Sequence, residues 1–172
     1  EAAELSGFDH EAVLHSGGSV SPEMQVPKLA WLKRNRPELW AEAGGIFDLA
    51  DYLTFRATGS DRRSLSTLSA KWFYRGDHVL PWPLGLLEKA DLTDLRDKAA
   101  IPEIILVPGD AAGRLTVAAA SDLDLSGEVV VAAGLIDAYA GALGALPPPD
   151  RKADGELALI GGTSSCIVGY ES

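Results

Sequence analysis

The stretch VVVAAGLIDAYAGALG (129–144), followed after a polar break by ELALIGGTSSCI (156–167), decides how this chain folds. An apolar strand runs into Asp137, and a helix of small residues begins there. A second apolar strand then ends in a turn of Gly, Thr and Ser. Buried-type strands that alternate with helices predict an α/β fold.

The residues around this stretch supply further helix and strand signals. Ser21, Asp48 and Ser64 each precede an apolar-periodic segment and are predicted N-caps. Leu65, Leu68 and Trp72 recur at helical spacing, with Lys71 at the flank of their stripe. The sequence predicts helices over 21–34, 37–43, 49–58, 65–74, 115–123 and 138–146, short helical turns over 84–90 and 92–99, and strands over 104–107, 129–133, 156–160 and 166–170.

Composition excludes several classes of protein. The 172 residues are 47 % hydrophobic, which is typical of a globular domain, and the net charge is −10. An acidic chain lacks the surplus of Lys and Arg that a broad nucleic-acid face or binding to an anionic membrane requires. No apolar run reaches the roughly 18 residues of a membrane span. The single cysteine, Cys166, permits no internal disulfide, and we expect a cytoplasmic location.

Asp137 is the first candidate for chemistry. A carboxylate at a strand–helix junction is often an ordinary N-cap. It can also be a general base, because catalytic groups of α/β sheets gather at the carboxyl ends of strands. Backbone N–H groups at the helix start favour the ionised carboxylate, which can then accept the proton of a hydroxyl that attacks phosphorus.

The turn Gly161–Ser165 is the second candidate. A Gly/Ser/Thr turn after a strand is often only a hairpin loop. It can also cradle a phosphate with backbone N–H groups and hydroxyls, although the GxxxxGK[ST] and GxGxxG patterns are absent.

Lys71 is the third candidate, although a lone Lys beside an apolar stripe is most often a surface cation. The three histidines stand apart and there are no Cys pairs, so we predict no metal site of protein side chains.

Four stretches, in the same order, resemble the FGGY family of carbohydrate kinases, and RSLSTLSAKW (63–72) resembles its ribulokinase-like branch. The four are SPEMQVPKLAWLKRNRPELW (21–40), FDLADYLTFRATGS (47–60), VVVAAGLIDAYAGALG (129–144) and IGGTSS (160–165).

This resemblance implies part of an actin-like/ribonuclease H-like ATPase domain. It implies a kinase that uses ATP and Mg²⁺ to phosphorylate a terminal hydroxyl of a pentulose or polyol, with D-ribulose or ribitol as the expected substrate. It places the catalytic base on Asp137, which also contacts the substrate, and the sugar-binding lysine on Lys71. It places the nucleotide phosphate turn on Gly162, Thr163 and Ser164.

The resemblance also implies a domain division. Residues 1–150 match the later part of the first kinase domain, and residues 151–172 match the opening hairpin of the second. The DxGT phosphate loop with which family members begin has no counterpart here. We therefore expect an incomplete piece that is inactive alone, and a non-catalytic binding or assembly domain remains the alternative. The expected partners are a sugar or polyol and ATP, and the oligomeric state stays open, a homodimer included.

Overall fold

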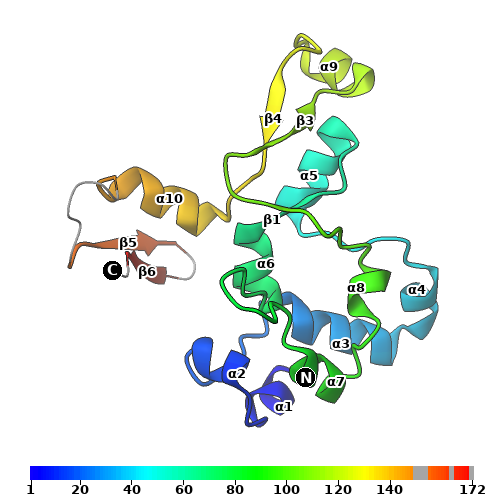
Figure 1. Ribbon diagram of the computed structural model, residues 1–172, viewed down its shortest axis with the longest axis vertical. Helices are drawn as coiled ribbons and strands as arrows, with labels where there is room; N and C mark the ends of the chain where they lie inside the picture. Colours follow the sequence, from blue (N-terminus) through cyan, green and yellow to red (C-terminus); the bar gives the residue numbers. More distant parts are fainter. Residues whose placement is uncertain (149–154, 163–164, 171–172) are drawn as a thin grey trace. The chain divides into compact units, whose positions relative to one another are not determined.

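The computed structural model describes residues 1–148, 155–162 and 165–170. Its residues form two compact units, Glu1–Gly134 and Leu135–Ser172, which are described separately below (Figure 1). Among the described residues, none of the helices combines the length and the hydropathy that crossing a bilayer requires.

The larger unit contains helices and two short pairs of strands. In chain order its elements are α1 (Ala2–Ser6), α2 (Glu11–His15), α3 (Gln25–Asn35), α4 (Pro37–Glu42), α5 (Leu49–Thr58), β1 (Arg63–Ser64), α6 (Leu65–Trp72), α7 (Leu84–Lys89), α8 (Leu95–Lys98), β2 (Ile105–Leu106), β3 (Ala111–Arg114), α9 (Val117–Leu123) and β4 (Val130–Ala132). Strand β1 pairs with β2 in parallel, and β3 pairs with β4 antiparallel. Helices and strands in both units confirm the predicted α/β class.

The main core of the larger unit lies where α6 meets the helices around it. Leu68 and Trp72 of α6 are 0 % and 1 % exposed, and Leu65 is half-buried, so the apolar stripe predicted for this helix is confirmed. Val26 of α3 and Leu86 of α7 are fully buried in the same cluster. Burial of this stripe fixes α6, and with it Lys71, against the core.

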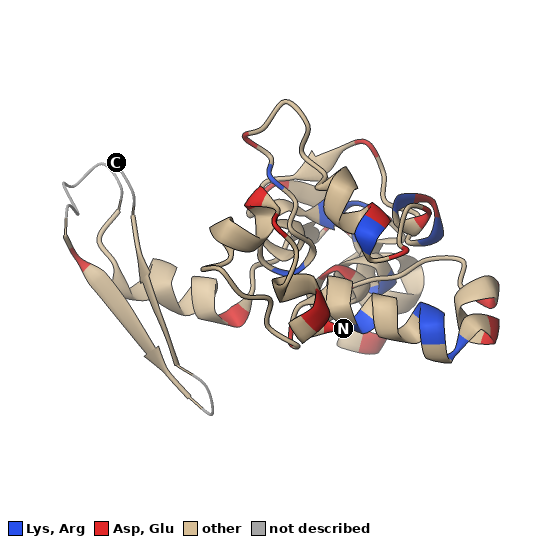
Figure 2. Cartoon of the chain, turned by 90° about the horizontal axis from the view of Figure 1, so that it is seen from below, with Lys and Arg blue, Asp and Glu red and all other residues tan. Residues whose placement is uncertain are grey.

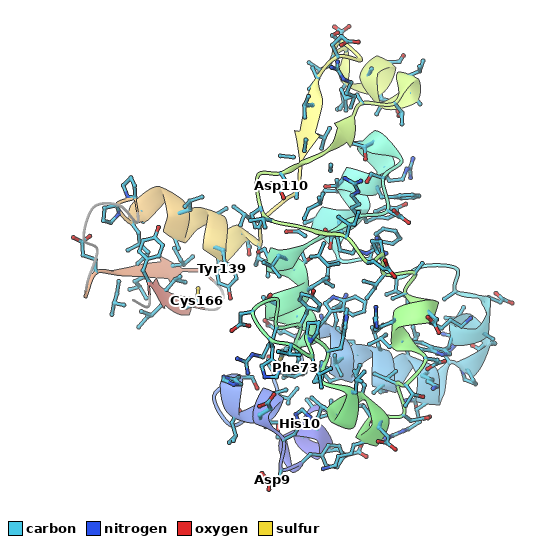
Figure 3. The ribbon with its side chains drawn as sticks, viewed as in Figure 1. Asp9, His10, Phe73, Asp110, Tyr139 and Cys166 are labelled. Atoms are coloured by element: carbon cyan, nitrogen blue, oxygen red, sulfur yellow. The ribbon has the colours of Figure 1, made fainter. Side chains whose placement is uncertain are left out.

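Some helix boundaries differ from the prediction. Helix α3 begins at Gln25, because the chain first makes a turn in which Met24 N–H donates to Ser21 O. Helix α6 ends at Trp72, because Phe73, labelled in Figure 3, adopts a left-handed φ of 59°. A left-handed residue cannot continue a right-handed helix, which ends the predicted 65–74 segment two residues early.

The smaller unit is a helix packed on a hairpin. Helix α10 (Asp137–Ala145) contacts the antiparallel strands β5 (Leu157–Gly161) and β6 (Ser165–Gly169). Gly141 lets the helix approach the hairpin closely, since a Cβ built there would lie 3.2 Å from Ile160 Cδ1. The small residues of this helix thus permit close packing on β5 at Gly141.

Candidate functional site

Lys71 lies in the last turn of α6 and is half-buried. The helix begins where the sequence predicted, because the Ser64 hydroxyl accepts a hydrogen bond from Ser66 N–H and caps it. Trp72 and Leu68 anchor the same helix in the core. Lys71 therefore extends from a helix that is fixed at its start by a cap and along one side by packing.

A carboxylate stands close to Lys71 at the start of α5. Asp48 occupies the predicted N-cap position, but its side chain makes no cap hydrogen bond and instead accepts one from Trp72 Nε1. Burial raises the pKa of Asp48, whereas the Trp72 hydrogen bond and the positive charge of Lys71 oppose that rise. The capping prediction for Asp48 is wrong in this respect, because the indole of Trp72 competes for the carboxylate.

A buried polar network lies beside this pair. Asp51 is 3 % exposed, and its Oδ1 accepts a hydrogen bond of 2.8 Å from Ser64 N–H. Thr67 Oγ1 lies 2.5 Å from Asp51 Oδ2, and the Ser64 hydroxyl donates to the carbonyl of Gly134 over 2.7 Å. Buried polar groups are stable only when they are paired, so this network fixes the junction of β1 and α6.

Asp137 is the first residue of α10 and is exposed. Its Oδ1 accepts a hydrogen bond of 2.8 Å from Ala138 N–H. The predicted placement at a helix start is confirmed, and the carboxylate stays open to a molecule outside the chain. This geometry suits both an exposed helix-start carboxylate and a general base.

The candidate phosphate turn lies between the paired residues Gly161 and Ser165. Gly161 and Gly162 are exposed, and a Cβ built at Gly161 would meet no atom within 4 Å. The backbone at Gly161 is therefore open to close approach. Thr163 and Ser164, the other two residues predicted for this turn, lie outside the described residues.

The charges of the smaller unit limit how it could hold an anion. Its described residues include the acidic Asp137 and Glu156 and no Lys or Arg (Figure 2). An anion at the hairpin would thus be held by backbone N–H groups, not by side-chain cations of these residues. Across the described ranges, no three His, Cys, Asp or Glu side chains come close enough to hold a metal ion.

The structure places the candidate residues in two groups. Lys71 belongs to the larger unit, together with Asp48 and the network of Asp51, whereas Asp137 and Gly162 belong to the smaller unit. Sequence reasoning missed the roles of Asp48 and Asp51. The two residues are three positions apart, and this spacing puts both carboxylates on one side of α5. That spacing was the signal that the sequence offered.

Comparison with known proteins gives consistent matches, although no family model matches the chain. This chain is 41 % identical to an FGGY carbohydrate kinase domain-containing protein of Danio rerio, over 96 % of this chain and 32 % of that protein. The human protein of the same description is 40 % identical, over 93 % of this chain and 31 % of its own length. A D-ribulokinase of Saccharomyces cerevisiae is 31 % identical over 98 % of this chain and 28 % of its own length.

Solved structures agree with these relatives. A xylulose kinase from Brucella ovis superposes with a TM-score of 0.71 at 30 % identity, over 97 % of this chain and 32 % of that structure. A xylulose kinase from Rhodospirillum rubrum shares the fold, with a TM-score of 0.64 at 23 % identity, over 97 % of this chain and 33 % of that structure. The predicted resemblance and the predicted kinase fold are confirmed, and the chain spans about a third of the length of the curated relatives it matches.

Proposed function

We infer from this similarity to FGGY-family carbohydrate kinases that the chain is part of an ATP-dependent sugar kinase. The observation that carries the proposal is identity of about two residues in five along nearly the whole chain with proteins of that description. Proteins named ribulokinases are also among the relatives. We propose a pentulose or polyol as the acceptor, with D-ribulose or ribitol as the first candidates.

In this proposal Asp137 is the general base. Its exposed carboxylate accepts the proton of the terminal hydroxyl of the sugar, so that the hydroxyl oxygen can form its bond to phosphorus. Its support is a position at the start of α10, where Ala138 N–H donates a hydrogen bond to the carboxylate.

Lys71 holds the sugar. A half-buried lysine on a fixed helix can donate to substrate hydroxyls with little loss of side-chain freedom. The Asp48 carboxylate lies near enough for the positive charge of Lys71 to lower the pKa of Asp48 against the effect of burial.

ATP supplies the phosphoryl group when it is bound. Gly162, Thr163 and Ser164 would face its phosphates, and the open backbone at Gly161 is compatible with that approach. The described residues offer no cluster that fits Mg²⁺, so the expected Mg²⁺ has no ligand set among them.

We further propose the domain division that the resemblance implies, with residues 1–150 in the first kinase domain and residues 151–172 in the second. This proposed boundary differs from the boundary between the two compact units, which falls after Gly134 because α10 packs on the hairpin. Because the chain spans about a third of its relatives, we expect the 172 residues alone to release no ADP from ATP, with or without sugar.

The test is a coupled ADP-release assay on the full-length protein, with D-ribulose, ribitol, L-ribulose and D-xylulose. Asp137→Asn should lower kcat by about 10²- to 10⁴-fold, the usual contribution of a general base. Lys71→Met should raise the KM for the sugar by about tenfold or more and leave the KM for ATP unchanged, since it removes a charge-assisted hydrogen bond.

Two matched variants control for loss of charge. Glu156→Gln removes another carboxylate from the smaller unit, and Lys89→Met removes a lysine from the last turn of α7. Both should behave like the unmodified protein. Near-normal turnover of Asp137→Asn would exclude Asp137 as the base. If Lys71→Met changed only the KM for ATP, Lys71 would not be a sugar-binding residue.

A further inference from the structure

Ser64 is 1 % exposed, and its hydroxyl hydrogen-bonds to two separate segments of the chain. Its hydroxyl accepts from Ser66 N–H over 3.2 Å and donates to Gly134 O over 2.7 Å. A hydroxyl has one proton and two lone pairs, so both bonds can exist at once. One side chain thus caps α6 and holds a carbonyl 70 positions further along the chain.

The two segments joined by Ser64 are those that carry the proposed substrate and base residues. Lys71 lies two turns after Ser64 on α6. Gly134 is the last residue of the larger unit, and Asp137 follows three residues later. The hydrogen bond therefore fixes the point at which the chain leaves the larger unit towards Asp137.

Ser64 is itself held firmly. Asp51 Oδ1 accepts from its backbone N–H over 2.8 Å, and β1 pairs with β2 in the register Ser64–Leu106. Asp51 and Thr67, on either side of it, are 3 % and 2 % exposed. A residue fixed by buried partners on both sides is a rigid anchor for whatever it binds.

We propose that Ser64 is a positioning residue for phosphoryl transfer, which ties the start of the Lys71 helix to the start of the Gly134–Asp137 segment. This inference rests on the proposed function of Asp137 and Lys71. Ser64 touches neither substrate nor reacting atoms in this role. It acts by fixing the point at which the chain leaves the larger unit towards Asp137. Small displacements of reacting groups cost much of the rate, so this point matters for turnover.

The experiment compares Ser64→Ala with Thr116→Ala in the full-length protein. Thr116 is the matched control, since its hydroxyl caps α9 by accepting from Ala119 N–H over 3.1 Å and bonds to neither segment. Ser64→Ala should lower kcat about tenfold or more and raise the KM for the sugar severalfold, with the KM for ATP unchanged. Thr116→Ala should lower the Tm as a lost cap does, with kcat and both KM values unchanged.

Ser64→Thr keeps the hydroxyl and should recover most of the lost kcat. If Ser64→Ala does not fold, Ser64→Cys replaces it, because a thiol of similar size hydrogen-bonds weakly and should show the same kinetic loss. Adding Ser64→Ala to Asp137→Asn should lower kcat no further, since the base that Ser64 positions is already absent.

Kinetic constants of Ser64→Ala, or of Ser64→Cys where Ser64→Ala does not fold, within twofold of the unmodified protein would overturn the inference. So would equal kinetic losses in that variant and in Thr116→Ala. Failure of the proposed function looks different, because Asp137→Asn would then keep its turnover whatever Ser64→Ala does.

Discussion

At the scale of single residues, the contacts of Thr67 bear on the protonation of Asp51. Thr67 Oγ1 lies 2.5 Å from Asp51 Oδ2 and 2.8 Å from Ser64 O, yet the hydroxyl has a single proton. Both contacts are hydrogen bonds if Asp51 carries a proton and donates to Thr67, which then donates to Ser64 O. Burial raises the pKa of Asp51 in agreement with this arrangement, although the bonds from Thr67 and Ser64 and the charge of Arg63 oppose the rise.

A raised pKa in the folded state makes stability depend on pH. The folded chain then holds the Asp51 proton more strongly than the unfolded chain does, whose carboxyl has its ordinary pKa of about 4. The contribution of Asp51 is therefore fully present below about pH 4 and is lost as the pH rises through the folded pKa. Asp51→Asn keeps one hydrogen-bond acceptor and one donor but does not titrate, so it should remove this loss. The free energy of unfolding of the variant, relative to that of the unmodified chain, should therefore increase as the pH rises.

Urea unfolding at several pH values between 4 and 8 measures the difference. Asp9→Asn is the control, since Asp9 is exposed and points away from the chain (Figure 3). Burial also raises the pKa of Asp48, and the charge of Asp51 adds to that rise, so Asp51→Asn removes this second contribution as well. A difference between Asp51→Asn and the unmodified chain that stays constant with pH would show that Asp51 is ionised throughout.

At the scale of elements, α10 shows how two glycines of one helix differ in their surroundings. A Cβ at Gly141 would lie 3.2 Å from Ile160 Cδ1 of β5, whereas one at Gly144 would meet nothing within 4 Å. A side chain at Gly141 would thus need Ile160 to shift by a few tenths of an ångström. Gly144 only lowers the helix propensity.

Leucine substitutions should separate these two effects. Gly141→Leu should destabilise the packing of α10 on β5 by about 1–3 kcal/mol through overpacking. Gly144→Leu should stabilise the helix by up to about 1 kcal/mol. Hydrogen exchange at the amides of β5 and β6 measures both, and equal protection in the two variants would contradict the role given to Gly141.

At the scale of the whole chain, the two units have cores of very different size. The larger unit has a continuous cluster that runs from Leu5 to Ala99, while the buried cluster of the smaller unit consists of Ala142, Leu146 and Ala158 among the described residues. Units of about 40 residues or fewer seldom stay folded on so little buried apolar area.

We therefore predict that residues 1–134 fold alone and that residues 135–172 do not. All four tryptophans belong to the larger unit, so tryptophan fluorescence reports on it alone. Residues 1–134 should unfold cooperatively in a thermal scan followed by this signal. A cooperative transition of residues 135–172 in far-UV circular dichroism would contradict the prediction.

The sequence alone determined the elements whose signals are local. The spacing of Leu65, Leu68 and Trp72 predicted α6, and Ser64 was recognised as its cap. Asp137 was predicted at the start of a helix of small residues, and the resemblance to a kinase family followed from several long motifs in order. Such features depend on residues a few positions apart, where helical periodicity and capping preferences operate.

The tertiary structure alone decided which distant groups meet. Strands β1 and β3, of two and four residues, are too short for a pattern and exist because of their partners β2 and β4. The bond of Trp72 to Asp48 and that of Ser64 to Gly134 join residues 24 and 70 positions apart. The physical reason is that a buried polar group must be paired, and its partner is chosen by which segments the core brings together, not by its neighbours in the sequence.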